Sequence, residues 1–148
     1  MPVLLPATGM RSDAFAILLG LVCSLLLVPL EGRASESLSP QTEQLIVDAV
    51  EAAYELDLFN NRCRHDRSGR RTENLNKVLA SGFRMTVLDA QDDLFPEGYY
   101  RDVQARMSED FLERLEALGG CAGAKEKKLR DTLRERYEET MRRLEQFP

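Results

Sequence analysis

Covalent chemistry in this sequence depends on few residues, because its 148 positions hold three cysteines and one histidine. Cys63 and Cys121 are 58 positions apart, which excludes the close cysteine pairing of thiol–disulfide exchange enzymes. Cys23 lies in an apolar N-terminal segment and is expected to leave with it. Two cysteines in an exported chain predict one structural disulfide, Cys63–Cys121. Two free thiols, or a bond between two chains, are the alternatives.

The single histidine, His65, is followed by Asp66, a pairing that could serve acid–base catalysis. Neighbours in an irregular segment are not a preorganised pair, and no serine or free cysteine has an evident base. The sequence also lacks a metal-binding or nucleotide-binding motif. We therefore predict no catalytic residue, no metal and no cofactor.

Basic residues crowd two short segments and could bind an anionic group. Arginine side chains present a planar fork that suits phosphate and carboxylate. A solvated loop, with some cations at helix C-termini, is the alternative. The predicted basic site consists of Arg62, Arg64, Arg67, Arg70, Arg71, Lys125, Lys127 and Lys128.

An acidic and aromatic segment surrounds a predicted turn at residues 96–98. Exposed aromatic residues in a turn can anchor a protein partner, or they can close one end of the core. The carboxylates do not follow the spacing of a calcium-binding loop. Two of the carboxylates, from Asp92, Asp93 and Glu97, could act as the acid and the base of a small hydrolase. The predicted acidic–aromatic site consists of Asp92, Asp93, Phe95, Tyr99 and Tyr100, with Glu97 as a further candidate acid.

The N-terminus predicts export. Residues 14–30 form an apolar run of 17 residues that is preceded by Arg11 and followed by small residues around Ala34. This is the layout of a secretory signal, with cleavage after Ala34 and Met10 as a possible true start. We predict residues 1–34 as signal peptide, a periplasmic or secreted location, and no stable membrane insertion after cleavage. An uncleaved anchor is the alternative, at the short limit for spanning a bilayer.

The chain outside the signal, residues 35–148, is mildly acidic. Residues 1–34 hold two basic and two acidic side chains, so the remainder keeps the net charge of −5 of the whole chain. Such a charge gives no general attraction to nucleic acid. About 114 residues suffice for one modest core.

The hydrophobic pattern predicts four helices and no strand. Apolar residues recur at helical spacing from Pro40 to Phe59, from Thr72 to Leu94, from Tyr99 to Leu118 and from Lys125 to Phe147. Residues 60–71 have no such period and predict a loop, and Gly119 and Gly120 end the third helix. Segments of similar length with short connections favour an all-α, up-down-up-down four-helix bundle. In that topology both cysteines fall at one end.

Together these features favour an exported, non-enzymatic helical protein that binds a macromolecule, either a protein or an anionic envelope partner, as a periplasmic adaptor does. A small envelope hydrolase that uses the acidic residues near the second turn is one alternative. A periplasmic stress chaperone, which exposes apolar faces when reduced or acidified, is another.

Overall fold

The structure is a computed structural model that describes residues 38–147. The predicted signal peptide at residues 1–34 and the possible start at Met10 lie outside the described residues. Six helices make up the described part, and no strand occurs in it. Their bounds are α2 (Pro40–Arg64), α3 (Arg70–Gly82), α4 (Val87–Leu94), α5 (Tyr100–Ala117), α6 (Gly120–Glu126) and α7 (Leu129–Glu145).

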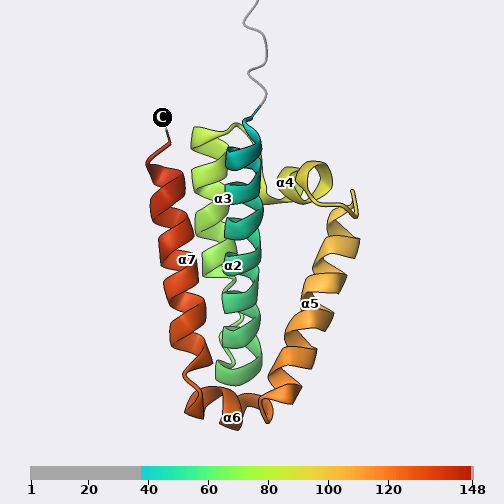
Figure 1. The fold of residues 1–148 in the computed structure, drawn as a ribbon, viewed down its shortest axis with the longest axis vertical. Coiled ribbons are helices and arrows are strands. Elements are labelled where there is room, and N and C mark those ends of the chain that lie inside the picture. The colour runs from blue at the N-terminus through green and yellow to red at the C-terminus, as the bar shows by residue number, and fades with distance from the viewer. Residues whose placement is uncertain (1–37, 148) are drawn as a thin grey trace, which may run out of the picture. The chain divides into compact units, whose positions relative to one another are not determined.

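Helix α2 is the central element, and α3, α4, α5 and α7 all pack against it (Figure 1). It begins with Ser39 as the N-terminal cap, whose hydroxyl accepts the Thr42 N–H at 3.2 Å, and with Pro40 in the first turn. Its alanines are small enough for neighbouring helices to approach closely: Ala49, Ala52 and Ala53 are fully buried. A helix covered on several sides has more buried positions than one apolar stripe, and Ala52 is one of them.

The predicted single helix from Thr72 to Leu94 is wrong, because the chain breaks after Gly82. Phe83 leaves the helix, and Arg84 takes a left-handed conformation with φ of 56°. Thr86 then starts α4 with a capping box, in which its hydroxyl accepts the Asp89 N–H and the Asp89 carboxylate accepts the Thr86 N–H. This break lets α4 cross from α3 to α5, so that α5 packs on the side of α2 away from α3 (Figure 1).

The connection from α5 to α7 contains a helix that the sequence did not predict. Gly119 and Gly120 do end α5, as predicted, and both have positive φ angles of 89° and 70°. The short helix α6 follows directly and carries Cys121. Lys128 then takes a left-handed conformation, so the last long helix begins at Leu129 and not at Lys125.

The core consists of two clusters along α2. One joins the first half of α2 to α3, α4, the start of α5 and the end of α7, with Ile46, Leu79 and Val103 fully buried. The other joins the second half of α2 to the end of α5, α6 and the start of α7, around Phe59, Phe111 and Leu133. The disulfide packs against this second cluster.

The all-α class and the Cys63–Cys121 disulfide are confirmed. The four-helix bundle is not confirmed, because the described residues form six helices. The four longer ones alternate in direction, and α4 and α6 cross between them at opposite ends (Figure 1). None of the helices within residues 38–147 is both long and apolar enough to span a membrane.

Candidate functional site

The end of α2 holds the first part of the predicted basic site. Residues 60–64 were predicted as loop, but they continue the helix to Arg64. The helix closes at His65, whose left-handed conformation lets its N–H and that of Asp66 donate to the Asn60 carbonyl, the latter at 3.0 Å. Arg62 and Arg64 are therefore exposed on an ordered last turn of α2.

The disulfide brings the second basic segment to the same end. Cys63 and Cys121 have Cα atoms 5.4 Å apart, and the bond ties α6 to the end of α2. The turn that precedes α6 is tight, because a Cβ atom on Gly123 would lie 1.8 Å from the Leu118 carbonyl oxygen. Only glycine fits there without a backbone shift. Lys125, Lys127 and Lys128 are exposed, and they follow Cys121, which the disulfide joins to the last turn of α2.

Arg71 does not belong to this exposed set. It is half-buried, and its guanidinium lies 3.8 Å from Asp57 and 3.5 Å from Asp66. Asp57 also accepts the Thr72 N–H at 2.9 Å and the Thr72 hydroxyl at 3.0 Å. A carboxylate of α2 thus satisfies the first turn of α3. Arg71 completes this junction and is a structural residue.

The other seven predicted basic residues form what we call the cationic end. All seven are exposed, and none makes an ion pair within residues 38–147. They are Arg62, Arg64, Arg67, Arg70, Lys125, Lys127 and Lys128.

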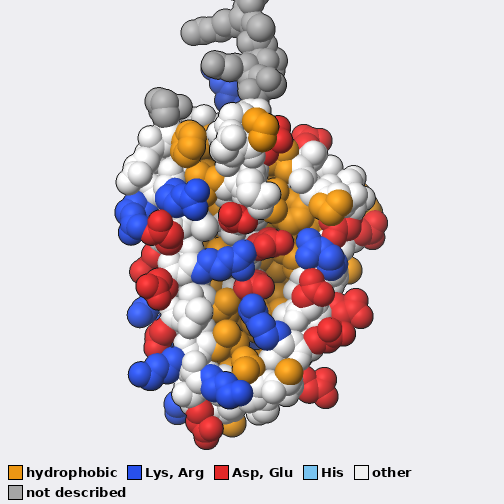
Figure 2. Space-filling view, in the orientation of Figure 1, with side chains coloured by type: hydrophobic (Ala, Val, Ile, Leu, Met, Phe, Trp, Pro, Cys, Tyr) orange, Lys and Arg blue, Asp and Glu red, His pale blue; other side chains and the backbone are white. Residues whose placement is uncertain are grey.

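Charge is strongly segregated toward this end. Residues 62–71 and 125–130 together hold nine basic and two acidic residues, a net of +7, whereas the whole chain carries −5. The rest of the chain therefore carries −12. Exposed carboxylates are frequent along α5, on the side opposite α7 (Figure 2).

The predicted acidic–aromatic site lies at the opposite end, around α4 and the start of α5. Phe95 is buried and belongs to the core, as one of the two interpretations predicted. Asp92 accepts the Tyr100 N–H at 2.5 Å, so it satisfies the first turn of α5. Asp93 and Tyr99 are exposed, and the ring of Tyr99 stands edge-on to that of Tyr100 with centroids 5.1 Å apart. The predicted residues are thus divided between core, cap and surface.

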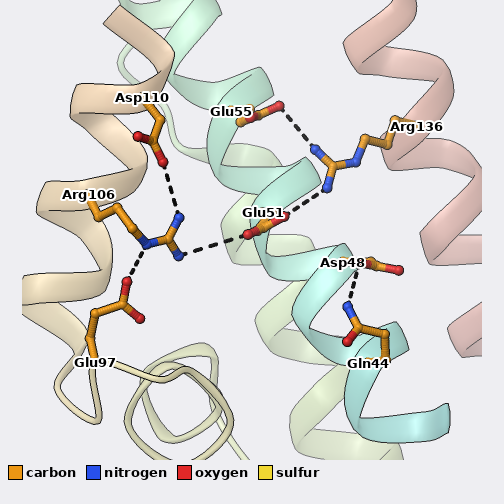
Figure 3. Close-up of polar contacts among 8 residues, drawn as sticks. All are labelled: Gln44, Asp48, Glu51, Glu55, Glu97, Arg106, Asp110 and Arg136. Carbon is orange, nitrogen blue, oxygen red and sulfur yellow. Dashed lines mark hydrogen bonds and ion pairs between the residues drawn. The ribbon is translucent and has the colours of Figure 1, made fainter. Parts of the chain in front are cut away.

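The middle of the molecule holds a network of arginines and glutamates that was not predicted from the sequence (Figure 3). Glu51 of α2 lies 3.0 Å from Arg136 of α7 and 3.9 Å from Arg106 of α5. Glu55, one turn further along α2, lies 3.2 Å from Arg136 and 3.0 Å from Arg114. We call these five residues the central ion-pair network. It connects α5 and α7 through α2, above the apolar side chains visible between them (Figure 2).

Glu97 extends this network and is not a free acid. Its carboxylate accepts a hydrogen bond from Arg106. This hydrogen bond lowers the pKa of Glu97 below its usual value, and the same contact raises the pKa of Arg106. The pairs between helices could have been suggested only if the packing of α5 and α7 against α2 had been known, since those partners lie 55 or more positions apart.

A shallow pocket of about 380 Å³ lies between α3 and α7. Burial raises the pKa of Tyr137, the aromatic residue in it. Two cations and two carboxylates share its rim, so it favours neither sign of charge, and none of the predicted site residues lines it. The lining residues are Asn74, Lys77, Val78, Tyr137, Glu138, Met141, Arg142 and Glu145.

Within residues 38–147 no three His, Cys, Asp or Glu side chains are grouped closely enough to hold a metal ion. Comparison with protein-family models, with curated proteins and with solved structures gives no match. The case for function therefore depends on the geometry of this molecule alone.

Proposed function

We propose that the protein is an exported, non-enzymatic binding protein that attaches to an anionic component of the cell envelope through its cationic end. The observation that carries the proposal is the contrast between arginines. Arg106, Arg114 and Arg136 each reach a carboxylate of α2, whereas the basic side chains of the cationic end reach none in the described part of the chain. Unpaired like charges held together repel one another, and an anionic partner relieves that repulsion.

The disulfide supports this function because it keeps the two halves of the cationic end together. Without it, α6 would be held by its connections to α5 and α7 and by the packing of Ala124 in the second core cluster, with no covalent tie to the end of α2. The proposed export through residues 1–34 agrees with such a bond, since oxidising compartments preserve disulfides.

The test is sedimentation of the exported protein with isolated envelope fragments. The variant Arg62→Ser/Arg64→Ser/Arg67→Ser/Arg70→Ser should lose binding, because it removes four exposed charges and no described ion pair. The matched control is Lys77→Ser/Arg134→Ser/Arg142→Ser/Arg143→Ser. It also removes four positive charges, one from α3 and three from α7, away from the cationic end. Equal binding of the two variants would overturn the proposal.

The hydrolase alternative has less support. A general acid needs a raised pKa so that it keeps its proton. The hydrogen bond from Arg106 instead lowers the pKa of Glu97, and the Asp92 carboxylate accepts the Tyr100 N–H at the start of α5.

The chaperone alternative has one specific observation in its favour. The disulfide packs against the second core cluster, where α6 helps to cover Phe111 and Leu133. Reduction would loosen that cover and expose apolar surface. Binding of an environment-sensitive dye, measured with and without reductant, tests it: a large increase at temperatures where the helices persist would favour the chaperone over a rigid binding protein.

A further inference from the structure

From the chemistry of the cationic end we infer that its partner is an anionic phospholipid bilayer, on which the molecule docks end-on. This inference rests on the proposed function and names the class of partner. It follows from three observations: the types of side chain at this end, the absence of apolar anchors in it, and the distribution of charge over the remaining helices.

The side chains suit phosphate groups. Four of the seven are arginines, whose guanidinium groups donate two parallel hydrogen bonds to one phosphate. Three segments present them: the last turn of α2, the connection to α3 with the first residue of α3, and the segment from α6 to α7. A surface made by several segments at one end of the molecule can contact many headgroups at once. Near an anionic bilayer, each lysine or arginine strengthens binding roughly fivefold.

The cationic end lacks the anchors that protein partners use. Protein interfaces are usually centred on buried aromatic or large apolar side chains. The exposed large hydrophobic residues of the described part are Leu88, Tyr99, Leu112 and Phe147, and none belongs to the cationic end. Binding that depends on charge alone suits a dense array of phosphates, which needs no complementary shape.

The other helices favour the end-on orientation. The first turn of α5 and the whole of α4 lie at the far end of α2 from the disulfide (Figure 1), and they carry Asp89, Asp93 and Asp102 on the surface. Two exposed carboxylates adjoin the cationic end in sequence: Glu126 lies between Lys125 and Lys127, and Asp131, in the first turn of α7, pairs with Arg134 at 3.6 Å. With +7 on the two basic segments and −12 elsewhere, an anionic surface attracts one end and repels the rest. We therefore expect α2 to stand steeply on the membrane, with α6 facing the headgroups.

The experiment is flotation of the exported protein with protein-free vesicles of two compositions. One is phosphatidylcholine alone, and the other is phosphatidylcholine mixed with phosphatidylglycerol, whose anionic headgroups give the vesicle a negative surface potential. We expect at least about tenfold stronger binding to the anionic vesicles. The substitution of Arg62, Arg64, Arg67 and Arg70 by serine should remove at least about ninety per cent of that binding, and added salt should do the same. The control variant on α3 and α7 should stay within about twofold of the unsubstituted protein.

Two results would overturn the inference. Equal binding to both kinds of vesicle would indicate attachment by apolar residues and not by the cationic end. The second result is that the protein binds neither kind of vesicle, while envelope fragments still retain the unsubstituted protein and not the quadruple variant. This result would indicate that the partner is an envelope protein or glycan. The proposed function would then stand, and the lipid would not be the partner. Inorganic phosphate at millimolar concentration, added to the anionic vesicles, should not compete, because single ions lack the array.

Discussion

Two regions of this molecule use arginine in opposite ways. In the middle, Arg106, Arg114 and Arg136 lie against Glu51 and Glu55, and their side chains are between 37% and 41% exposed. At the disulfide end, Arg62, Arg64, Arg67 and Arg70 are exposed and reach no carboxylate within residues 38–147. The first group joins three helices, and the second adds positive charge to a surface that a disulfide already holds. The residue type is the same, so the role of an arginine is decided by what the fold places opposite it.

The largest effect is expected from removing the Cys63–Cys121 disulfide, which brings the two basic segments of the cationic end together. The double variant Cys63→Ser/Cys121→Ser should lower the free energy of unfolding by about 4 kcal/mol, because the bond closes a loop across 58 positions. Urea unfolding, followed by circular dichroism, measures it, and reduction of the unsubstituted protein should give a similar loss.

The same variant should affect the two regions unequally. Amide exchange should accelerate in α6 and at the end of α2, and change little around Glu51, which the central ion-pair network and the first core cluster hold. A uniform acceleration along α2 would show that the two regions are not separable. A loss below about 1 kcal/mol would show that packing alone holds α6.

A smaller effect is expected from breaking the central ion-pair network. Glu55 is 17% exposed and pairs with both Arg114 and Arg136. Glu55→Gln keeps the shape and removes the charge, so it should cost about 1–2 kcal/mol of unfolding free energy.

The matched control for that variant is Glu138→Gln. Glu138 is 66% exposed and lies 3.8 Å from Arg134 on the same helix. Such an exposed pair contributes about 0.3–0.5 kcal/mol. Equal costs for the two variants would mean that the central network is an ordinary set of surface pairs.

The pH dependence of stability should report Glu97. The hydrogen bond from Arg106 lowers the pKa of Glu97 in the folded state below its usual 4.5. A lowered folded pKa stabilises the protein above the unfolded pKa, and that contribution disappears as the pH falls through the folded value. Unfolding free energies measured between about pH 5 and pH 3 should therefore fall less steeply for Glu97→Gln than for the unsubstituted protein. Identical slopes would mean that Glu97 titrates alike in both states.

The parts of the fold that could be predicted from sequence are those fixed by local chemistry. Ser39 and Pro40 start α2, Gly119 and Gly120 end α5, and two cysteines permit one bond. A helix end at Gly82 was not predicted, although Thr86 and Asp89 have the spacing of a capping box, because the apolar period continues across it.

The remaining errors concern residues whose conformation depends on distant partners. Residues 60–64 have no apolar period, yet they continue α2, which ends with His65 in a left-handed conformation and carries Cys63 in its last turn. Arg71 was grouped with the basic loop, but Asp57, 14 positions earlier, turns it into part of a helix junction. Seven of the eight predicted basic residues are exposed as expected, since many like charges in a short segment can seldom all be paired.

The smallest expected effect is the one that separates the two uses of arginine most sharply. Replacing Arg62, Arg64, Arg67 and Arg70 together by serine should change the free energy of unfolding by no more than about 0.5 kcal/mol. The two arginines in the last turn of α2 interact favourably with the helix C-terminus, by a few tenths of a kcal/mol each. Removing four clustered charges relieves repulsion of similar size, so the two changes offset one another.

The single variant Arg136→Ser, which leaves Glu51 and Glu55 without their shared partner, should cost more than these four together, about 1–2 kcal/mol. Thermal unfolding of both variants, scanned in the same buffer, compares them directly. If the quadruple variant were the less stable one, the cationic end would be part of what holds the fold, and its unpaired charge would no longer indicate a binding surface.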